Sequence, residues 1–470
     1  MRLQAKKIMD TSNNQKEFIL KEDLTKVMWK LSLPAIAAMV LFGLNAFLDT
    51  VFVGQLINET ALAGVALAYP LTSIMFGIGS LAGTGAASAL SIALGANDAT
   101  TQKKLLGNAT LMMLVSTAIF AIPAYIFAES LIQMMGGKGA ILQEGVRYFK
   151  VTLLGSFFWI YGLGLNFIIR GEGKMKQAAI MMIYGLALNI ILNPIFIKVL
   201  GWGVEGAAWA TNIGMILYCI IEYWYFVKGK ASFEAQIQVI RYDKAVFRSI
   251  VSMGMPGFIM SLMGLVQAIV VFNALSNYGT ERDLAFFAAA NRLMLFLMTP
   301  LFGLMRAMQP VTGISFGAGN YDRVKRSFIV FSKTGFYIVA PFWLLLTLFP
   351  SGALHLVLPK MVFTASELFN FRVYMAVLPV LPVVFMALTF FPSINEGKYG
   401  SIIGLARQLV FYVPIMLILP RLFGIQWIYV GATLIDIILT LWVLAIVRQL
   451  FKKLIPNTKQ VLAVSQEEAL

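Results

Sequence analysis

Long apolar runs separated by short polar segments dominate the chain. Charged residues bound these runs, and most are at least as long as the 20 or so residues that an α-helix needs to cross a bilayer. Twelve runs are predicted to be transmembrane helices: 31–56, 61–95, 105–128, 148–169, 177–199, 206–227, 249–276, 284–314, 328–354, 371–395, 399–420 and 424–447. The pattern therefore predicts an all-α integral membrane protein.

Basic residues are distributed unevenly among the loops between these runs. Lysine and arginine cluster in the loops that twelve crossings place on the side of the N-terminus, and the opposite loops carry few. Because basic residues collect in cytoplasmic loops, both termini are expected in the cytoplasm of a multi-pass inner or plasma membrane protein. The predicted division is a cytoplasmic N-terminal segment 1–30, an N-lobe 31–227, a cytoplasmic linker 228–248, a C-lobe 249–447 and a cytoplasmic tail 448–470.

The two lobes repeat each other in sequence. At an offset of 222 residues, Pro34 falls on Pro256 and Gly95 on Gly317. Each half has six predicted crossings, so the halves are parallel repeats related by an axis along the membrane normal. Two six-helix bundles around a central cleft can rock against each other and give alternating access. The duplication therefore favours a transporter over a receptor or scaffold.

Composition narrows the function further. The 470 residues are 59% hydrophobic and only 13% charged, against about a quarter charged in soluble proteins. The net charge of +15 fits cytoplasmic loops that face anionic lipid, and we expect no nucleic-acid binding. The one cysteine, Cys219, excludes a cysteine-based metal cluster, and without a P-loop ATP is not the energy source. We expect no cofactor, no metal site and no enzymatic activity.

Asp49 is the clearest ionisable residue at membrane depth, since it is the only charge between Lys30 and Glu59. Burial favours the neutral form of a carboxyl group, so Asp49 is predicted to gain and lose a proton near neutral pH, with Asn45 one turn before it. The alternative is that Asp49 is solvated at the outer end of the first helix. Polar groups that could surround it are Tyr148, Asn166, Asn189, Asn193 and Thr211. They could equally be interhelical hydrogen bonds, worth about 0.6 kcal/mol each.

The second half carries no acid in its first predicted helix. Residues that are candidates to line the cavity are Gln267, Asn273, Arg292, Arg306 and Gln309. An intramembrane arginine can bind an anionic group or snorkel to the interface, and Arg306 lies deeper than Arg292. Arg407 could be an inner-end anchor, and the role of Asp436 stays open.

Several short motifs follow one another in a characteristic order. They are Leu33-Pro34, Asp49-Thr50-Val51-Phe52-Val53-Gly54, Leu94-Gly95-Ala96, Arg170-Gly171-Glu172-Gly173, Asn189-Ile190-Ile191-Leu192-Asn193-Pro194, Gln309-Pro310 and Phe316-Gly317-Ala318-Gly319-Asn320. Over essentially the whole chain they resemble the multidrug and toxic compound extrusion (MATE) family, and within it the DinF/MepA-type branch.

The resemblance implies roles for particular residues. Asp49 would take up a proton within a polar network of the N-lobe, and Pro34 would allow the first helix to bend. Many relatives have an aspartate where this chain has Asn193, which leaves Asp49 as the only acid of that network. The acids of the NorM-type Na⁺ site are also missing.

The function expected from the sequence is therefore proton-coupled antiport of amphipathic organic cations by a monomer. The alternative is an exporter or flippase of an anionic or lipid-linked metabolite, which intramembrane arginines would suit.

Overall fold

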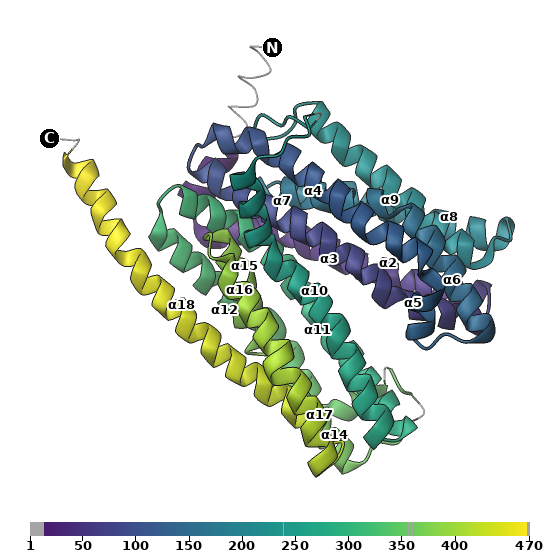
Figure 1. The fold of residues 1–470 in the computed structure, drawn as a ribbon. Coiled ribbons are helices and arrows are strands. Elements are labelled where there is room, and N and C mark those ends of the chain that lie inside the picture. Colours follow the sequence, from purple (N-terminus) through teal and green to yellow (C-terminus); the bar gives the residue numbers. More distant parts are fainter. Residues whose placement is uncertain (1–13, 238, 356, 360, 468–470) are drawn as a thin grey trace.

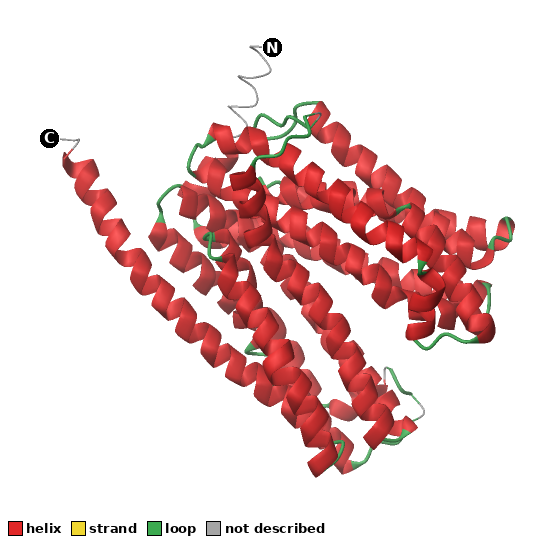
Figure 2. Ribbon diagram, in the orientation of Figure 1, coloured by secondary structure: helices red, strands yellow, loops and turns green. Residues whose placement is uncertain are grey.

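The computed structural model describes residues 14–237, 239–355, 357–359 and 361–467, and every regular element in these ranges is helical (Figures 1 and 2). The first bundle contains α2 (Leu24–Leu56), α3 (Glu59–Gly95), α4 (Ala99–Ile126), α5 (Ala128–Met134), α6 (Gly139–Leu154), α7 (Ser156–Gly171), α8 (Met175–Pro194), η1 (Ile195–Val199) and α9 (Gly203–Val227). The second contains α10 (Lys244–Tyr278), α11 (Glu281–Gly317), α12 (Tyr321–Leu348), α13 (Pro350–His355), α14 (Ala365–Met375), α15 (Leu381–Ser393), α16 (Gly397–Leu405), η2 (Ala406–Tyr412), α17 (Val413–Phe423) and α18 (Trp427–Glu467).

Each of the twelve predicted crossings corresponds to a helix or to consecutive helices. Ten continuous stretches are long and apolar enough to span a bilayer, and α6 with α7 forms a further span that is bent by 55°. The remaining crossing consists of the short helices α14 and α15. Helix α18 continues past residue 447, where the sequence predicted the tail to begin. Residues 1–13 of the predicted N-terminal segment and 468–470 of the tail lie outside the described ranges.

The bend between α6 and α7 has a local cause. The backbone leaves regular helix at Gly155, and the amide nitrogen of Asn212 on α9 donates to the Val151 carbonyl oxygen at 2.7 Å. A Cβ atom on residue 155 would overlap the Asn212 side chain. A helix break at membrane depth needs such a donor, because lipid offers none to the exposed carbonyl group.

The internal repeat is visible in how the two bundles meet. Gly95 on α3 packs against the Ile314 carbonyl and Gly317 on α11, and Gly317 packs in turn against the Ile92 carbonyl. Gly95 and Gly317 are 222 positions apart, as are Ile92 and Ile314, so each helix makes the same contact with the other. Such a reciprocal contact is expected where a pseudo-twofold axis passes between α3 and α11. The loops that follow α7 and α15 also repeat an ion pair, Lys174–Glu172 at 3.3 Å and Lys398–Glu396 at 3.4 Å.

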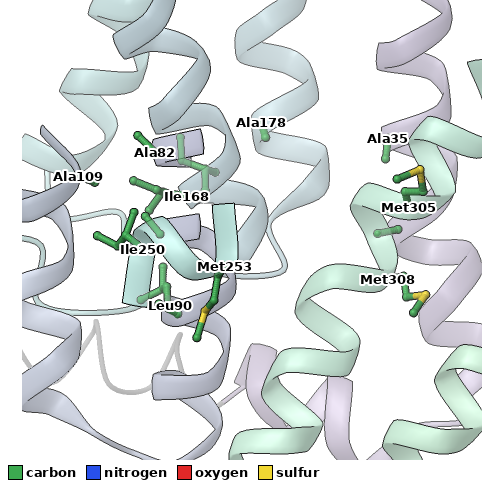
Figure 3. Close-up of a cluster of buried hydrophobic side chains, with 14 of the residues drawn as sticks. Ala35, Ala82, Leu90, Ala109, Ile168, Ala178, Ile250, Met253, Met305 and Met308 are labelled. Carbon is green, nitrogen blue, oxygen red and sulfur yellow. The ribbon is translucent and has the colours of Figure 1, made fainter. Parts of the chain in front are cut away.

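The two lobes are packed together at the end where α10 begins, and their helices diverge toward the other end (Figure 1). One hydrophobic core joins both lobes at the packed end: Ile250 and Met253 of α10 belong to the same cluster as Leu90 of α3 (Figure 3). Met305 and Met308 of α11 lie in that core near α2. A second core contains only C-lobe residues, from Val271 to Ile435. The lobes are therefore joined at one end and separate at the other.

Glycines make the close approach at the packed end possible. A Cβ atom on Gly254 of α10 would overlap the carbonyl oxygen of Leu81 on α3, and one on Gly85 would overlap the carbonyl oxygen of Ile250. Small residues of this kind let membrane helices approach closely. The α3–α10 contact is thus a backbone-to-backbone seam between the lobes.

Candidate functional site

Asp49 lies on α2 within the N-lobe, where it faces α8. Its Oδ1 accepts a hydrogen bond from the Asn193 amide nitrogen at 2.7 Å. Asn193 is fully buried and Asp49 is half-buried. No cationic side chain among the described residues lies within ion-pair distance of Asp49, so its carboxylate is held by an amide alone.

A second contact between α2 and α8 lies one turn closer to the N-terminal ends of both helices. The Asn45 amide donates to Asn189 Oδ1 at 2.6 Å, and Asn189 Nδ2 lies 3.1 Å from the Thr211 hydroxyl on α9. Asn45 and Asp49 are four residues apart, as are Asn189 and Asn193, so each pair occupies one helix face. The equal spacing produces the two parallel contacts.

The Asn189 amide can serve this site in two orientations. In one, its oxygen accepts from Asn45 and Asn193. After a half-turn, its nitrogen lies 3.0 Å from Asp49 Oδ1 and its oxygen accepts from Thr211; the nitrogen then faces the Asn45 amide nitrogen at 2.6 Å, so the Asn45 amide has to turn with it. Asn189 can therefore offer either a donor or an acceptor toward the carboxyl side of the network.

Tyr148 and Pro34 complete the predicted N-lobe set. Tyr148 on α6 is half-buried and packs against the small core around Val53, which lies four residues after Asp49 on α2. Pro34 lies inside α2, which continues through it as one helix. Tyr148 thus lies near the Asp49 network. Pro34 lies on the same helix as Asp49 but several turns closer to its N-terminal end.

Asn166 is not part of this network. Its amide nitrogen donates to Glu222 Oε1 at 2.7 Å and its oxygen accepts from Arg170 Nε at 2.6 Å. Asn166, Arg170 and Glu222 are all at least 97% buried. Helical position alone could not show that Asn166 on α7 faces Ala178 of α8 and Glu222 of α9.

Glu222 and Arg170 were missed as candidates from the sequence. Glu222 falls inside the predicted span 206–227, so an acid within an apolar run was the available signal. Arg170 lies one residue past the predicted end of its span and was counted with the basic residues of a cytoplasmic loop. The structure instead buries both in the N-lobe.

The C-lobe has its own ionic contact at membrane depth. Arg407 Nε on η2 lies 2.9 Å from Asp436 Oδ1 on α18, and Arg407 Nη1 lies 3.5 Å from Gln267 Oε1. Asp436 is 7% exposed. This carboxylate is neutralised by an arginine, unlike that of Asp49. Arg407 and Asp436, whose roles were open, form a structural ion pair, and Gln267 belongs to it.

The other C-lobe candidates have different surroundings. Gln309 is buried between the lobes, where it donates to the Thr84 carbonyl at 2.9 Å and the Ser88 hydroxyl at 2.8 Å. Asn273 is exposed, and its only hydrogen bond within the described part of the chain goes to its own helix. Arg292 is exposed over the Phe47 ring at 5.5 Å, and Arg306 lies over the Phe167 ring at 4.1 Å. Of this set, Arg292 and Arg306 are charged, and each contacts an aromatic ring of the N-lobe.

A small apolar hollow, with a cavity volume of about 20 Å³, lies within the N-lobe among α2, α7, α8 and α9. It is lined by Phe42, Trp159, Leu163, Met182, Gly185, Leu186, Met215 and Tyr218. Leu186 is three residues before Asn189, and Met182 contacts Arg170. The hollow therefore lies along α8 between the Asp49 network and the Arg170 cluster. Within the described ranges, no group of three or more His, Cys, Asp or Glu residues could hold a metal ion.

Comparison with known proteins agrees with this architecture. The sequence model of the MatE family matches residues 34–195 and 252–418. The multidrug export protein MepA of Staphylococcus aureus (strain MRSA252) is 24% identical over 459 residues, which cover 96% of this chain and 99% of that protein.

Solved structures of transporters have the same fold as this chain. An outward-facing multidrug resistance MATE family transporter of the MOP superfamily superposes with a TM-score of 0.87 and 25% identity, covering 93% of this chain and 98% of that one. A MOP superfamily transporter from Pyrococcus furiosus Vc1 has a TM-score of 0.85 and 25% identity with the same coverage, and its binding pocket is described as having reversed polarity, suggestive of a different function.

Fold and site together define a multi-pass membrane transporter for small molecules, built from two lobes of six crossings each. The chain belongs to the MATE family of multidrug export proteins. Proteins of this family are transporters rather than enzymes, and the twelve-helix fold expected from the sequence is confirmed.

Proposed function

We propose that the protein exports amphipathic organic cations in exchange for protons, with Asp49 as the group that carries the proton. The observation that supports this is the state of the Asp49 carboxylate, which is half-buried, bound by the Asn193 amide and without a cationic partner among the described residues. An acid without a cation beside it can be neutralised by a proton or by a cationic substrate, but not by both together. Mutual exclusion of this kind is what antiport requires.

Two other membrane-embedded acids are less suited to this role. Asp436 is paired with Arg407, so a proton or substrate would have to displace the arginine. Glu222 is fully buried behind Asn166 and Tyr218, on the packed side of the hollow. Asp49 is the most exposed of the three.

The polar network gives protonation a structural consequence. An ionised Asp49 needs donors, which Asn193 and one orientation of Asn189 supply. A protonated Asp49 becomes a donor itself, and the other orientation of Asn189 then presents its oxygen. The amide of Asn189 also contacts Asn45 and Thr211, so a half-turn changes the bonds between α2, α8 and α9. Protonation would thereby alter how α2 packs in the N-lobe.

The direction of transport follows from the membrane orientation that we propose. Both termini lie in the cytoplasm, so the lobes are packed at the cytoplasmic end and diverge outward. A proton that enters from outside neutralises Asp49 and releases the cation outward. One proton moved down 100 mV supplies about 2.3 kcal/mol, enough for a modest accumulation ratio. A single chain contains both lobes, and we propose that it works as a monomer.

The test is efflux of ethidium from proteoliposomes under an imposed proton gradient or, separately, a Na⁺ gradient. We expect efflux with protons alone, and its loss in Asp49→Asn. Asp322→Asn is the matched control, because it removes one exposed carboxylate at the start of α12 and should transport normally. Efflux that needs Na⁺, or that survives in Asp49→Asn, would overturn the proposal.

The second candidate is export of an anionic or lipid-linked metabolite. It is favoured by Arg306, which lies at membrane depth with no acid within ion-pair distance among the described residues. The reversed polarity described for the Pyrococcus relative is in keeping with variation of this kind. Competition of anionic against cationic compounds for binding separates the two candidates.

A further inference from the structure

We propose that a groove between α8 and α9 at the membrane surface binds an anionic phospholipid, with Lys228 and Lys230 as the residues that hold its phosphate. The groove has a volume of about 420 Å³ and lies where α9 passes into the linker between the lobes. It is separate from the Asp49 network and from the small hollow, so the inference goes beyond the transport function and depends on neither the substrate nor the coupling ion.

The α9 side of the groove changes in character along one face of the helix. Ile220, Trp224 and Lys228 are spaced four residues apart, so they form a single line, and all three are exposed. The line runs from an aliphatic side chain to an aromatic ring and then to a cation at the end of the helix. The surface of a bilayer favours the same order, since tryptophan lies at headgroup level and lysine reaches the charged surface.

The remaining apolar lining comes from two membrane-spanning helices. Met181 belongs to α8 and Ile221 to α9, and both helices are long and apolar enough to cross a bilayer. They pack side by side, and in Figure 1 they lie on the side of the N-lobe away from the C-lobe. The groove therefore opens toward acyl chains rather than toward the space between the lobes.

Neither lysine is neutralised by the part of the protein that the structure describes. No acid there lies within ion-pair distance of Lys228 or Lys230, and the Lys228 ammonium group lies 4.9 Å from the centre of the Trp224 ring. An acid of the loop after α7, Glu172, is already paired with Lys174. Two unpaired cations at the rim of an apolar groove suit a phosphodiester with acyl chains attached. A zwitterionic phospholipid brings its own cation and gains less from them.

The lipid would bind beside the point where the linker is fastened to the N-lobe. Tyr225 lines the groove, and its hydroxyl accepts from Lys174 Nζ at 2.9 Å. Lys174 also donates to the carbonyl oxygen of Lys230, and Glu172 accepts from the backbone N–H of Ser232. A phosphate on the Lys230 side chain therefore adds a contact to a segment that the N-lobe already holds.

Quenching of Trp224 fluorescence by brominated lipids tests the site, because bromine on an acyl chain quenches a tryptophan that it contacts. The chain has eight tryptophans, so the signal is the difference between each protein and the same protein with Trp224→Phe. The full chain is reconstituted in phosphatidylcholine vesicles with rising fractions of brominated phosphatidylglycerol or brominated phosphatidylcholine. We expect half-maximal quenching at a fraction about tenfold or more lower for phosphatidylglycerol. Lys228→Gln with Lys230→Gln should remove most of this preference.

The matched control is Lys452→Gln with Lys453→Gln, which removes two exposed lysines from α18 and should leave Trp224 quenching unchanged. Equal fractions for the two lipids in the wild type, or an undiminished preference after loss of Lys228 and Lys230, would overturn the site. Glycerol 3-phosphate in solution should not relieve the quenching, because it has no acyl chain. If it did, the site would bind a soluble phosphate and not a lipid. The measurement uses no substrate and no ion gradient, so its outcome is separate from that of the efflux assay.

Discussion

The Asn193 amide nitrogen on α8 lies 2.7 Å from Asp49 Oδ1 on α2, so an uncharged residue holds the one unpaired acid of the polar network. A carboxylate in this place would compete for the same proton, whereas the Asn193 amide does not titrate and donates its N–H to Asp49. The site thus contains one titratable carboxyl group with its donor fixed on a neighbouring helix. A single proton can then change the contact between two helices.

Removing that donor should impair transport. In Asn193→Leu the Asp49 carboxylate loses a hydrogen bond to a charged group, worth roughly 1.5–3 kcal/mol. We expect proton-driven efflux to fall by about tenfold or more at equal protein levels. Asn273→Leu is the matched control, since Asn273 is exposed and, among the described residues, bonds only within α10. Equal efflux from the two variants would show that the Asn193 contact is dispensable.

Closure of the lobes should depend on Gly254. An added methyl group would meet the Leu81 carbonyl, so Gly254→Ala should push α10 away from α3 and weaken the packed state. Spin labels placed on the two lobes at that end should report a longer distance, and efflux should decrease. Gly264→Ala on the same helix, where nothing lies within 4 Å, should behave like the wild type. An unchanged distance in Gly254→Ala would contradict the role of the seam.

The Arg407–Asp436 pair should stabilise the fold and take no part in coupling. Asp436→Asn leaves a largely buried guanidinium without its counterion, and we expect a loss of about 3 kcal/mol in stability. The double variant Arg407→Met with Asp436→Leu should recover most of that loss and still show proton-driven efflux. Thermal unfolding in detergent and the efflux assay measure the two effects. A stable double variant without proton coupling would assign the coupling role to Asp436.

An ion pair at the end where the lobes diverge should resist acid. Arg282 Nε lies 2.7 Å from Glu367 Oε1, and the bond from Arg282 lowers the pKa of Glu367 to about 2. A lowered pKa in the folded state gives stability that is complete above the ordinary value of 4.5 and is lost as the pH falls toward 2. Wild type should therefore exceed Glu367→Gln in melting temperature at pH 7, and by less at pH 3. A constant difference across that range would exclude this linkage.

The sequence predicted the number, order and type of the crossings, because hydrophobic length decides which segments enter the bilayer. It could not predict the break at Gly155, since the apolar run continues through it and the cause is Asn212 on another helix. For the same reason Asn45 and Asn189 could be grouped with Asp49, whereas Asn166 could not be assigned correctly. Which way α7 faces is decided by its packing against α3, α8 and α9. Glu222 was visible as an acid in an apolar run, but its partners only appear in three dimensions.

The most direct test of the account is the release of protons when substrate binds. Purified protein in weakly buffered detergent at pH 7 would be titrated with tetraphenylphosphonium, a permanent organic cation, while a soluble indicator follows the pH. The account predicts proton release that saturates with binding in the wild type, at no more than about one proton per cation, and none in Asp49→Asn. Cation binding without proton release in the wild type, or equal release from Asp49→Asn, would contradict it.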